Sequence, residues 1–167
     1  NAKIQELKDA VGEHPLSGTT GIAHTRWATH GKPAEHNAHP HLSNGLAIVH
    51  NGIIENHAPL RKQLQDLGYS FTSETDTEVV AHLLAHHFAE TGDMLSAFRS
   101  TLGEIHGAYA LAVIHDSEPG TLYCSRMGSP LVIGEGSGEH YLAPDPLALL
   151  QVTDRFRYLE AVSHLEQ

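Results

Sequence analysis

The sequence predicts one domain built as a layered sandwich of strands and helices, of the α/β or α+β class. Its 167 residues, 40% of them hydrophobic and 18% charged, suffice for a globular domain with a substantial core. Apolar runs typical of strands stand in two groups along the chain, and a stretch with helical spacing lies between them. Strands and helices grouped in this way favour a layered architecture.

The first third of the chain is expected to lead from a helix into a strand and a loop. Ile4, Leu7 and Val11 recur at the spacing of an amphipathic helix. The expected elements are a helix over residues 3–12, a strand over 18–28, a long polar loop over 29–45 and a buried strand over 46–49 that ends at His50-Asn51-Gly52. A loop of that length is often functional.

The middle of the chain is expected to be helical and the last third to consist of strands. Helices are predicted over residues 59–67, 77–90 and 94–105, with a short strand over 69–72. Asn56 is a candidate cap of the first of these helices. After Gly107 we expect strands over 108–115, 121–125, 131–134, 139–143 and 156–159, with a short helix over 145–150.

Charge and cysteine content exclude several classes of protein. Ten Lys and Arg against 20 Asp and Glu give a formal charge of −10, which argues against a nucleic-acid surface and against binding to an anionic membrane. No apolar run approaches the roughly 20 residues of a membrane span. Cys124 is the only cysteine, which excludes an internal disulfide and fits a reducing cytoplasm. We expect its thiol to be buried and inert.

Polar residues stand at the ends of three predicted strand or loop segments. Arg26 offers a fork of donors that suits a carboxylate, and Asp76 offers an acceptor for an ammonium, so together they match an α-amino acid. The Asn51 amide and the Gly52 N–H are the kind of donor pair that an oxyanion hole requires. Structural alternatives are a solvated Arg26, an Asp76 that caps a helix, and an ordinary turn at 51–52.

The 15 histidines raise the question of a metal site. The candidate ligands are His36, His39 and His41, with His24 and His30 as further candidates. These residues lie in a polar loop without a second cysteine, so a solvated or hydrogen-bonded role is favoured. His82 and His86 are four residues apart, but the Glu that a zincin requires does not follow His82. With His87 they are expected to form a solvated helix face.

Four segments in this order resemble one family. They are GIAHTRWATHG at residues 21–31, NAHPH at 37–41, VHNGIIEN at 49–56 and SETDTE at 73–78. The family is the glutaminase domain, a class II glutamine amidotransferase, of the glutamine–fructose-6-phosphate aminotransferases, also called glucosamine-6-phosphate synthases. The similarity continues through GAY at 107–109 and GSPLVIG at 128–134, and it covers nearly the whole chain.

The resemblance implies a fold and an activity. The fold is the N-terminal-nucleophile (Ntn) hydrolase fold, an α+β, four-layer αββα sandwich of two antiparallel sheets, here lacking its N-terminal strands. Residues 1–167 are then one type-2 amidotransferase domain. It needs no cofactor and hydrolyses glutamine to glutamate, and the ammonia converts fructose 6-phosphate to glucosamine 6-phosphate. The implied partner is a phosphosugar isomerase domain, in a parent protein that is a homodimer.

The same resemblance assigns substrate contacts. Arg26 matches the residue that binds the glutamine α-carboxylate, with help from Thr29 and His30. Asp76 matches the residue that holds the α-ammonium. Both assignments agree with the charges expected from the residues themselves.

The resemblance also assigns the reaction machinery. Asn51 and Gly52 match the oxyanion hole, and Trp27 matches a residue that gates the passage of ammonia. The family's nucleophile is a cysteine at the mature N-terminus, whereas this chain begins at Asn1, and Cys124 matches no catalytic position. We therefore expect the chain as given to be an inactive fragment. The alternative is a non-catalytic module that binds an amino acid or regulates a partner.

Overall fold

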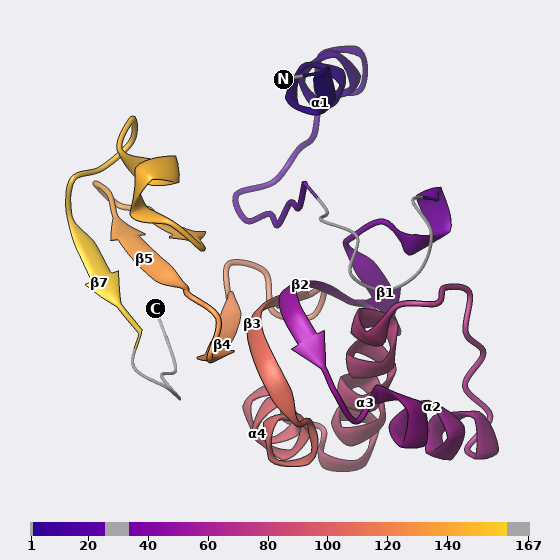
Figure 1. Cartoon of the computed structure of the whole chain (residues 1–167). Helices are drawn as coiled ribbons and strands as arrows, with labels where there is room; N and C mark the ends of the chain where they lie inside the picture. Colours follow the sequence, from indigo (N-terminus) through magenta and orange to yellow (C-terminus); the bar gives the residue numbers. More distant parts are fainter. Residues whose placement is uncertain (1, 26–33, 160–167) are drawn as a thin grey trace.

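The structure is a computed structural model that describes residues 2–25 and 34–159. Its fold is α+β with two antiparallel sheets, as the sequence predicts (Figure 1). The larger sheet has the order β1-β2-β3-β4. Its strands are β1 (His41–Ser43), β2 (Leu46–Ile54), β3 (Gly107–His115) and β4 (Tyr123–Met127).

The two long strands β2 and β3 form the centre of the larger sheet. They pair along their whole length, from Leu46 opposite His115 to Ile54 opposite Gly107. Strand β1 is much shorter, and its register with β2 ends where His41 pairs with Ile48. Beyond Ile48, this side of β2 is therefore an open edge with no strand partner among the described residues.

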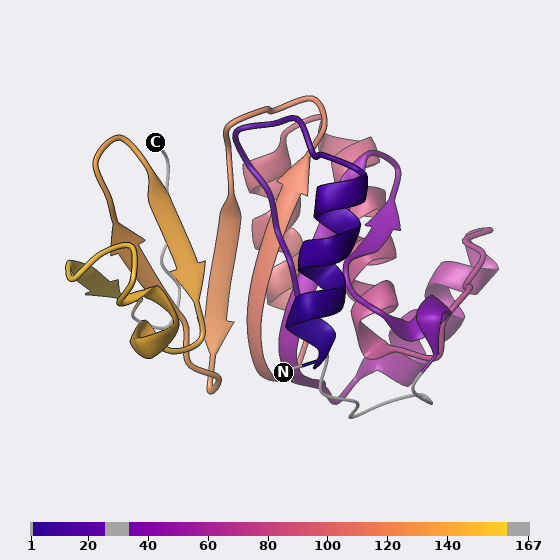
Figure 2. The same ribbon diagram turned by 90° about the horizontal axis from the view of Figure 1, so that it is seen from above.

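Helices lie on both sides of the larger sheet. They are α1 (Ala2–Glu13), α2 (His57–Asp66), α3 (Asp76–Thr91) and α4 (Met94–Glu104). Figure 2 shows α1 on the side of the sheet opposite α3 and α4. The main core lies between β2, β3 and the helices α2, α3 and α4, and includes Ile48, Leu84, Phe98 and Leu111. None of the helices in the described part of the chain combines the length and the apolar character of a membrane span.

The smaller sheet has the order β6-β5-β7 and joins the larger one through a second apolar cluster. Its strands are β5 (Val132–Glu135), β6 (His140–Ala143) and β7 (Phe156–Tyr158), and two short 3₁₀ helices are η1 (Glu35–Asn37) and η2 (Pro146–Leu149). On β3, Tyr109 and Leu111 face the main core, whereas Ala110 belongs to the second cluster with Cys124 and Ile133. Because side chains alternate along β3, one face of this strand packs in the main core and the other face packs in the second cluster.

Two strands predicted from the sequence are absent, and for one of them a side-chain hydrogen bond gives the reason. Residues 18–25 form no strand, and the rest of the predicted strand lies outside the described residues. Residues 69–72 form none either, because the backbone N–H of Thr72 donates to the Glu78 carboxylate at 2.7 Å instead of to a neighbouring strand. A strand forms only where another strand takes up its backbone groups. The predicted loop 29–45, by contrast, contains η1 and β1.

Two further predictions about side chains are wrong. Asn56 stands before α2 but makes no capping bond; its amide donates to the Glu104 carbonyl and its Oδ1 accepts from His106 N. His82 is not solvated either, since it is 9% exposed and its Nδ1 lies 2.8 Å from the Ser43 Oγ. His82 faces Ser43 of β1 and the rings of Tyr69 and Phe71, so tertiary packing covers it, whereas His86 and His87 are half-buried.

Candidate functional site

Asn51 and Gly52 lie inside strand β2 and not in a turn after it. The strand continues to Ile54, so the interpretation of residues 51–52 as a turn is wrong. Gly52 has φ +131°, and a Cβ there would lie 2.0 Å from the Ala108 carbonyl oxygen on β3. Only glycine fits this backbone conformation and this close approach. The sequence Asn-Gly therefore places a carboxamide beside a half-buried strand residue that has no side chain.

Asp76 is the first residue of α3 and does not cap the helix. The cap is Thr75, whose Oγ1 accepts a hydrogen bond from Glu78 N at 3.2 Å. The Asp76 Oδ2 instead accepts from the backbone N–H of Ile54 at 2.8 Å. Only 4% of the Asp76 side chain is exposed. The sequence thus places a buried carboxylate against the open edge of the strand that carries Asn51.

The loop that leads into Asp76 is held by two charged side chains. The Glu78 carboxylate accepts bonds from the backbone N–H and hydroxyl groups of both Thr72 and Ser73, at 2.6 to 2.9 Å. The Arg61 guanidinium donates to the carbonyls of Ser73 and Thr75, at 3.1 and 2.8 Å. These bonds fix the backbone on both sides of the turn, and hence the position of Asp76.

Glu78 carries its charge because of these bonds. Burial acts to raise the pKa of its carboxyl group, but the hydrogen bonds from Ser73 and Thr72 outweigh burial and bring the pKa below its ordinary value. Glu78 is therefore ionised under physiological conditions although it is almost completely buried.

A chain of hydrogen bonds runs from Asn51 to the neighbourhood of Asp76. His24 Nε2 lies 2.7 Å from Asn51 Oδ1, and His24 Nδ1 lies 3.1 Å from His39 Nδ1. His39 Nε2 is 3.0 Å from the Thr77 Oγ1, which is also 3.0 Å from His50 Nδ1. His50 Nδ1 is in turn 3.9 Å from the Asp76 carboxylate. The candidate oxyanion donor and the candidate ammonium acceptor are thus joined by side chains.

The sequence alone does not predict that role for any of these bridging residues. From the sequence, His24 and His39 are candidate metal ligands, and Thr77 has no predicted role. The signal was His50, which follows Leu46 and Ile48 at strand period on the buried face of β2, where a polar group requires a partner. Within the described residues, no three His, Cys, Asp or Glu side chains are grouped as metal ligands, and His39 and His41 bond to the hydroxyls of Thr77 and Thr75.

The remaining predicted site residues lie outside the described residues. They are Arg26, Trp27, Thr29 and His30. The described chain stops at Thr25, next to His24, and resumes at Ala34. Their assigned contacts therefore stay predictions.

Cys124 is the buried thiol that the sequence predicts. It lies in β4 opposite Ala112 and is 1% exposed. Burial raises the pKa of its thiol to about 11, so it is protonated at neutral pH. A protonated and covered sulfur is a poor nucleophile.

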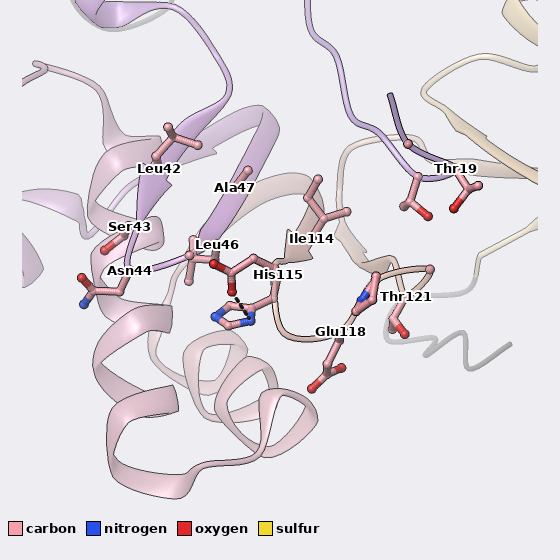
Figure 3. Close-up of a pocket in the computed structure, with 16 residues that line it drawn as sticks. Thr19, Leu42, Ser43, Asn44, Leu46, Ala47, Ile114, His115, Glu118 and Thr121 are labelled. Carbon is pink, nitrogen blue, oxygen red and sulfur yellow. Dashed lines mark ion pairs between the residues drawn. The ribbon is translucent and has the colours of Figure 1, made fainter. Parts of the chain in front are cut away.

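A pocket of about 550 Å³ lies elsewhere on the larger sheet. It is lined by the β1–β2 and β3–β4 turns and by residues 18–20, and Figure 3 shows Thr19 across the opening from Leu42 and Ala47. The dashed line there marks the pair of His115 and Asp116, whose facing atoms are 3.3 Å apart. Neither Asn51 nor Asp76 lines this pocket.

Known structures share this fold. One is the glutamine phosphoribosylpyrophosphate amidotransferase of B. subtilis complexed with ADP and GMP, which is 30% identical, with a TM-score of 0.62 over 81% of this chain and 29% of that chain. Another is the allosteric regulatory enzyme of purine biosynthesis, which is 28% identical, with a TM-score of 0.65 over 83% of this chain and 30% of that chain. The fold is therefore that of the Ntn amidotransferases.

The sequence specifies the family within that class. The profile of the family described as glutamine amidotransferase domain matches residues 24–151, and the chain belongs to this family. The glutamine–fructose-6-phosphate aminotransferase (isomerizing) of Pseudomonas syringae pv. tomato is 60% identical over 161 residues, and that of Escherichia coli K12 is 54% identical over 158. The matches cover 96% and 95% of this chain but 26% of each relative, so the chain spans about a quarter of their length.

Proposed function

We propose that the chain is the glutamine-hydrolysing part of a glutamine–fructose-6-phosphate aminotransferase. The observation that carries this proposal is the arrangement around β2, where the buried Asp76 carboxylate bonds to the strand that presents Asn51 and Gly52. A buried carboxylate at a helix start is well suited to an ammonium group, because a buried negative charge is costly without a positive partner and the ammonium is such a partner. Charge-assisted contacts of this kind contribute about 1.5–3 kcal/mol.

The proposed roles follow the functional groups. Asp76 holds the α-ammonium of glutamine, and Arg26 holds its α-carboxylate with Thr29 and His30. The side-chain amide of Asn51 and the backbone N–H of Gly52 donate hydrogen bonds to the oxyanion. Loss of one such donor typically costs about 10²–10³ in rate.

The proposed nucleophile is a cysteine outside residues 1–167. Its sulfur attacks the side-chain carbonyl carbon of glutamine, and the thiol proton passes through a base to the departing ammonia. Water then hydrolyses the thioester to glutamate and regenerates the thiol. The buried, protonated state of Cys124 supports this assignment, because this sulfur is poorly suited to the attack.

The use of the ammonia is a finer part of the proposal. We infer that it passes a gate formed by Trp27 to a phosphosugar isomerase domain, where fructose 6-phosphate becomes glucosamine 6-phosphate. The relatives' name and their greater length support this reading. A cytoplasmic homodimer without a cofactor completes the proposal.

The second candidate is a non-catalytic module that binds an amino acid. The observation that favours it is the same Cys124, since the only thiol of these residues is covered. In this case the chain would bind glutamine or glutamate without turning it over, even in the full natural protein.

The test is glutamate release from glutamine, measured on the 167-residue chain and on the full-length natural protein that contains it. We expect release only from the full-length protein, and its loss in Asp76→Ala. Asp66→Ala is the matched control, because Asp66 is exposed and pairs with Lys62 in the i,i+4 position. Glucosamine 6-phosphate formed from fructose 6-phosphate then tests the use of the ammonia. No release from the folded full-length protein, with glutamine bound, would establish the second candidate.

A further inference from the structure

We propose that His24 is a positioning residue that fixes the orientation of the Asn51 side-chain amide. A series of hydrogen bonds through His24, His39, Thr77 and His50 determines which nitrogen of His24 carries the hydrogen, and hence how the amide is turned. This inference rests on the proposed function, because it concerns the oxyanion donor of that reaction. It adds residues that touch neither the glutamine nor the reacting atoms.

The argument begins at Asn51. Its Oδ1 has lone pairs but no hydrogen, so the 2.7 Å contact with His24 Nε2 requires the hydrogen to be on the His24 nitrogen. The Asn51 oxygen is then held toward His24, and the two hydrogens of the amide nitrogen are directed away from it. The reverse orientation would turn a carbonyl oxygen toward an oxyanion and repel it.

The directions of the other hydrogen bonds follow from the tautomers of neutral imidazole, which has one donor and one acceptor nitrogen. With the hydrogen on Nε2, His24 accepts at Nδ1, so the 3.1 Å contact requires His39 to donate from its Nδ1. His39 then accepts at Nε2 from the Thr77 hydroxyl. That hydroxyl in turn accepts from the Nδ1–H of His50.

Asp76 favours the same direction at the other end. Its carboxylate lies 3.9 Å from His50 Nδ1, and a negative charge there stabilises a hydrogen on that nitrogen. Both ends of this series of hydrogen bonds therefore favour one direction, in which His50 donates and Asn51 accepts. The side chain of Asp76, a candidate substrate contact, thereby helps to determine how the Asn51 amide is turned.

The geometry of β2 explains how the chain connects its two faces. His50 and Asn51 are adjacent in the strand, so their side chains lie on opposite faces of the sheet. His39 stands two residues before β1, which pairs with β2 only as far as Ile48, and its imidazole joins Thr77 to His24.

The test uses glutamine hydrolysis by the full-length natural protein, with kcat and KM measured separately. His24→Met replaces the imidazole with a side chain that has no donor, and His24→Gln replaces it with one of similar length that donates from Nε2. We expect kcat to fall about 10- to 100-fold in His24→Met, below the full cost of losing an oxyanion donor. We expect His24→Gln to retain most of kcat, and KM for glutamine to stay within about twofold in both. His14→Leu, at an exposed imidazole after α1, is the control.

A double-mutant cycle with Asn51→Ala separates positioning from general damage. If His24 acts through Asn51, His24→Met lowers kcat in the natural background but has no further effect once Asn51 is alanine. The inference would be overturned if the fold losses of kcat in His24→Met and Asn51→Ala multiplied in the double variant. Equal kcat in His24→Met and His24→Gln would also overturn it. His24→Glu, which only accepts when ionised, serves if the Met variant does not fold: it is expected to lose kcat, and full activity would overturn the inference.

The same cycle separates this inference from the proposed function. An Asn51→Ala variant with unchanged kcat would overturn the oxyanion assignment itself, and the positioning role with it. A large loss in Asn51→Ala beside unchanged kcat in His24→Met would leave the proposed function in place and overturn only the role of His24.

Discussion

The Asp76 Oδ2 accepts a hydrogen bond from the backbone N–H of Ile54 at 2.8 Å, which joins the start of α3 directly to the end of β2. The bond uses a strand N–H at the open edge, where the described residues offer no neighbouring strand to accept it. The Asp76 carboxylate thus satisfies the last N–H of β2 and lies close to Asn51 and Gly52 in the sequence of that strand. The Asp76 side chain therefore has a structural role, the bond to β2, and a proposed binding role, the contact with the α-ammonium of glutamine.

Gly52 is expected to tolerate no side chain. In Gly52→Ala the new Cβ would lie 2.0 Å from a backbone oxygen of β3, so the strands must separate. We expect the free energy of unfolding to fall by more than about 4 kcal/mol, which is the range of the most disruptive substitutions. Gly68→Ala is the matched control, because φ is +95° there and nothing lies within 4 Å of the new Cβ, so only backbone strain of about 1–3 kcal/mol remains. Equal losses in urea unfolding would contradict this account.

Glu78 is expected to make stability depend on acid. Because hydrogen bonds outweigh burial and hold its folded-state pKa below the ordinary value of 4.5, its contribution is present above pH 4.5 and is lost as the pH falls through the folded-state pKa. Glu78→Gln should therefore lower the free energy of unfolding by about 1.5–3 kcal/mol at pH 7 and by less in acid. Urea unfolding at pH 7 and below pH 4.5 checks this, with the exposed Glu90→Gln as the control. A difference independent of pH would contradict it.

His82 is expected to add a second dependence at higher pH. Burial lowers its pKa below the ordinary value of 6.5; the charge of Glu78 acts in the opposite direction but does not prevail. Neutral His82 therefore contributes stability that is present above pH 6.5 and is lost as the pH falls through its folded-state pKa. His82→Gln cannot be protonated, so its melting temperature should fall less than that of the natural protein between pH 7 and pH 5.5. Parallel slopes would show that another group titrates.

Cys124 is expected to be dispensable for chemistry. Burial raises its pKa to about 11 and covers the sulfur, so alkylation at pH 8 should reach it only after unfolding. Mass spectrometry of the peptide that contains Cys124 measures this in the folded natural protein. Cys124→Ala should keep the natural kcat for glutamine hydrolysis. A folded Cys124→Ala protein without activity would contradict this account and make Cys124 a candidate nucleophile.

Local sequence patterns predicted the helices well and the open edge of β2 not at all. The period of about 3.6 residues located α3 and α4 to within a residue or two, because the apolar residues of a buried helix face recur at a fixed spacing along the sequence. The bond between His24 and Asn51 joins residues 27 apart, and no local period records such a contact. His82 was misplaced for the same reason, since its partner Ser43 is 39 residues away.

Chemistry found candidate residues that periodicity could not. Asn51, Gly52 and Asp76 were singled out by functional group and by family resemblance, and the structure joins them around one strand edge. The shape of that edge was not predictable, because it depends on where β1 stops pairing. The prediction of a turn at 51–52 failed because the pairing of β2 with β3 overrides the turn preference of Asn-Gly.

The most direct measurement of the central claim is the dependence of glutamate release on glutamine concentration, in the full-length natural protein and in Asp76→Asn and Asn51→Ala. The account predicts that Asp76→Asn raises KM about 10- to 150-fold, the equivalent of a lost charge-assisted contact. It predicts that Asn51→Ala lowers kcat about 10²–10³-fold with little change in KM. Natural kinetics in both folded variants would contradict the account, because neither residue would then take part in glutamine hydrolysis.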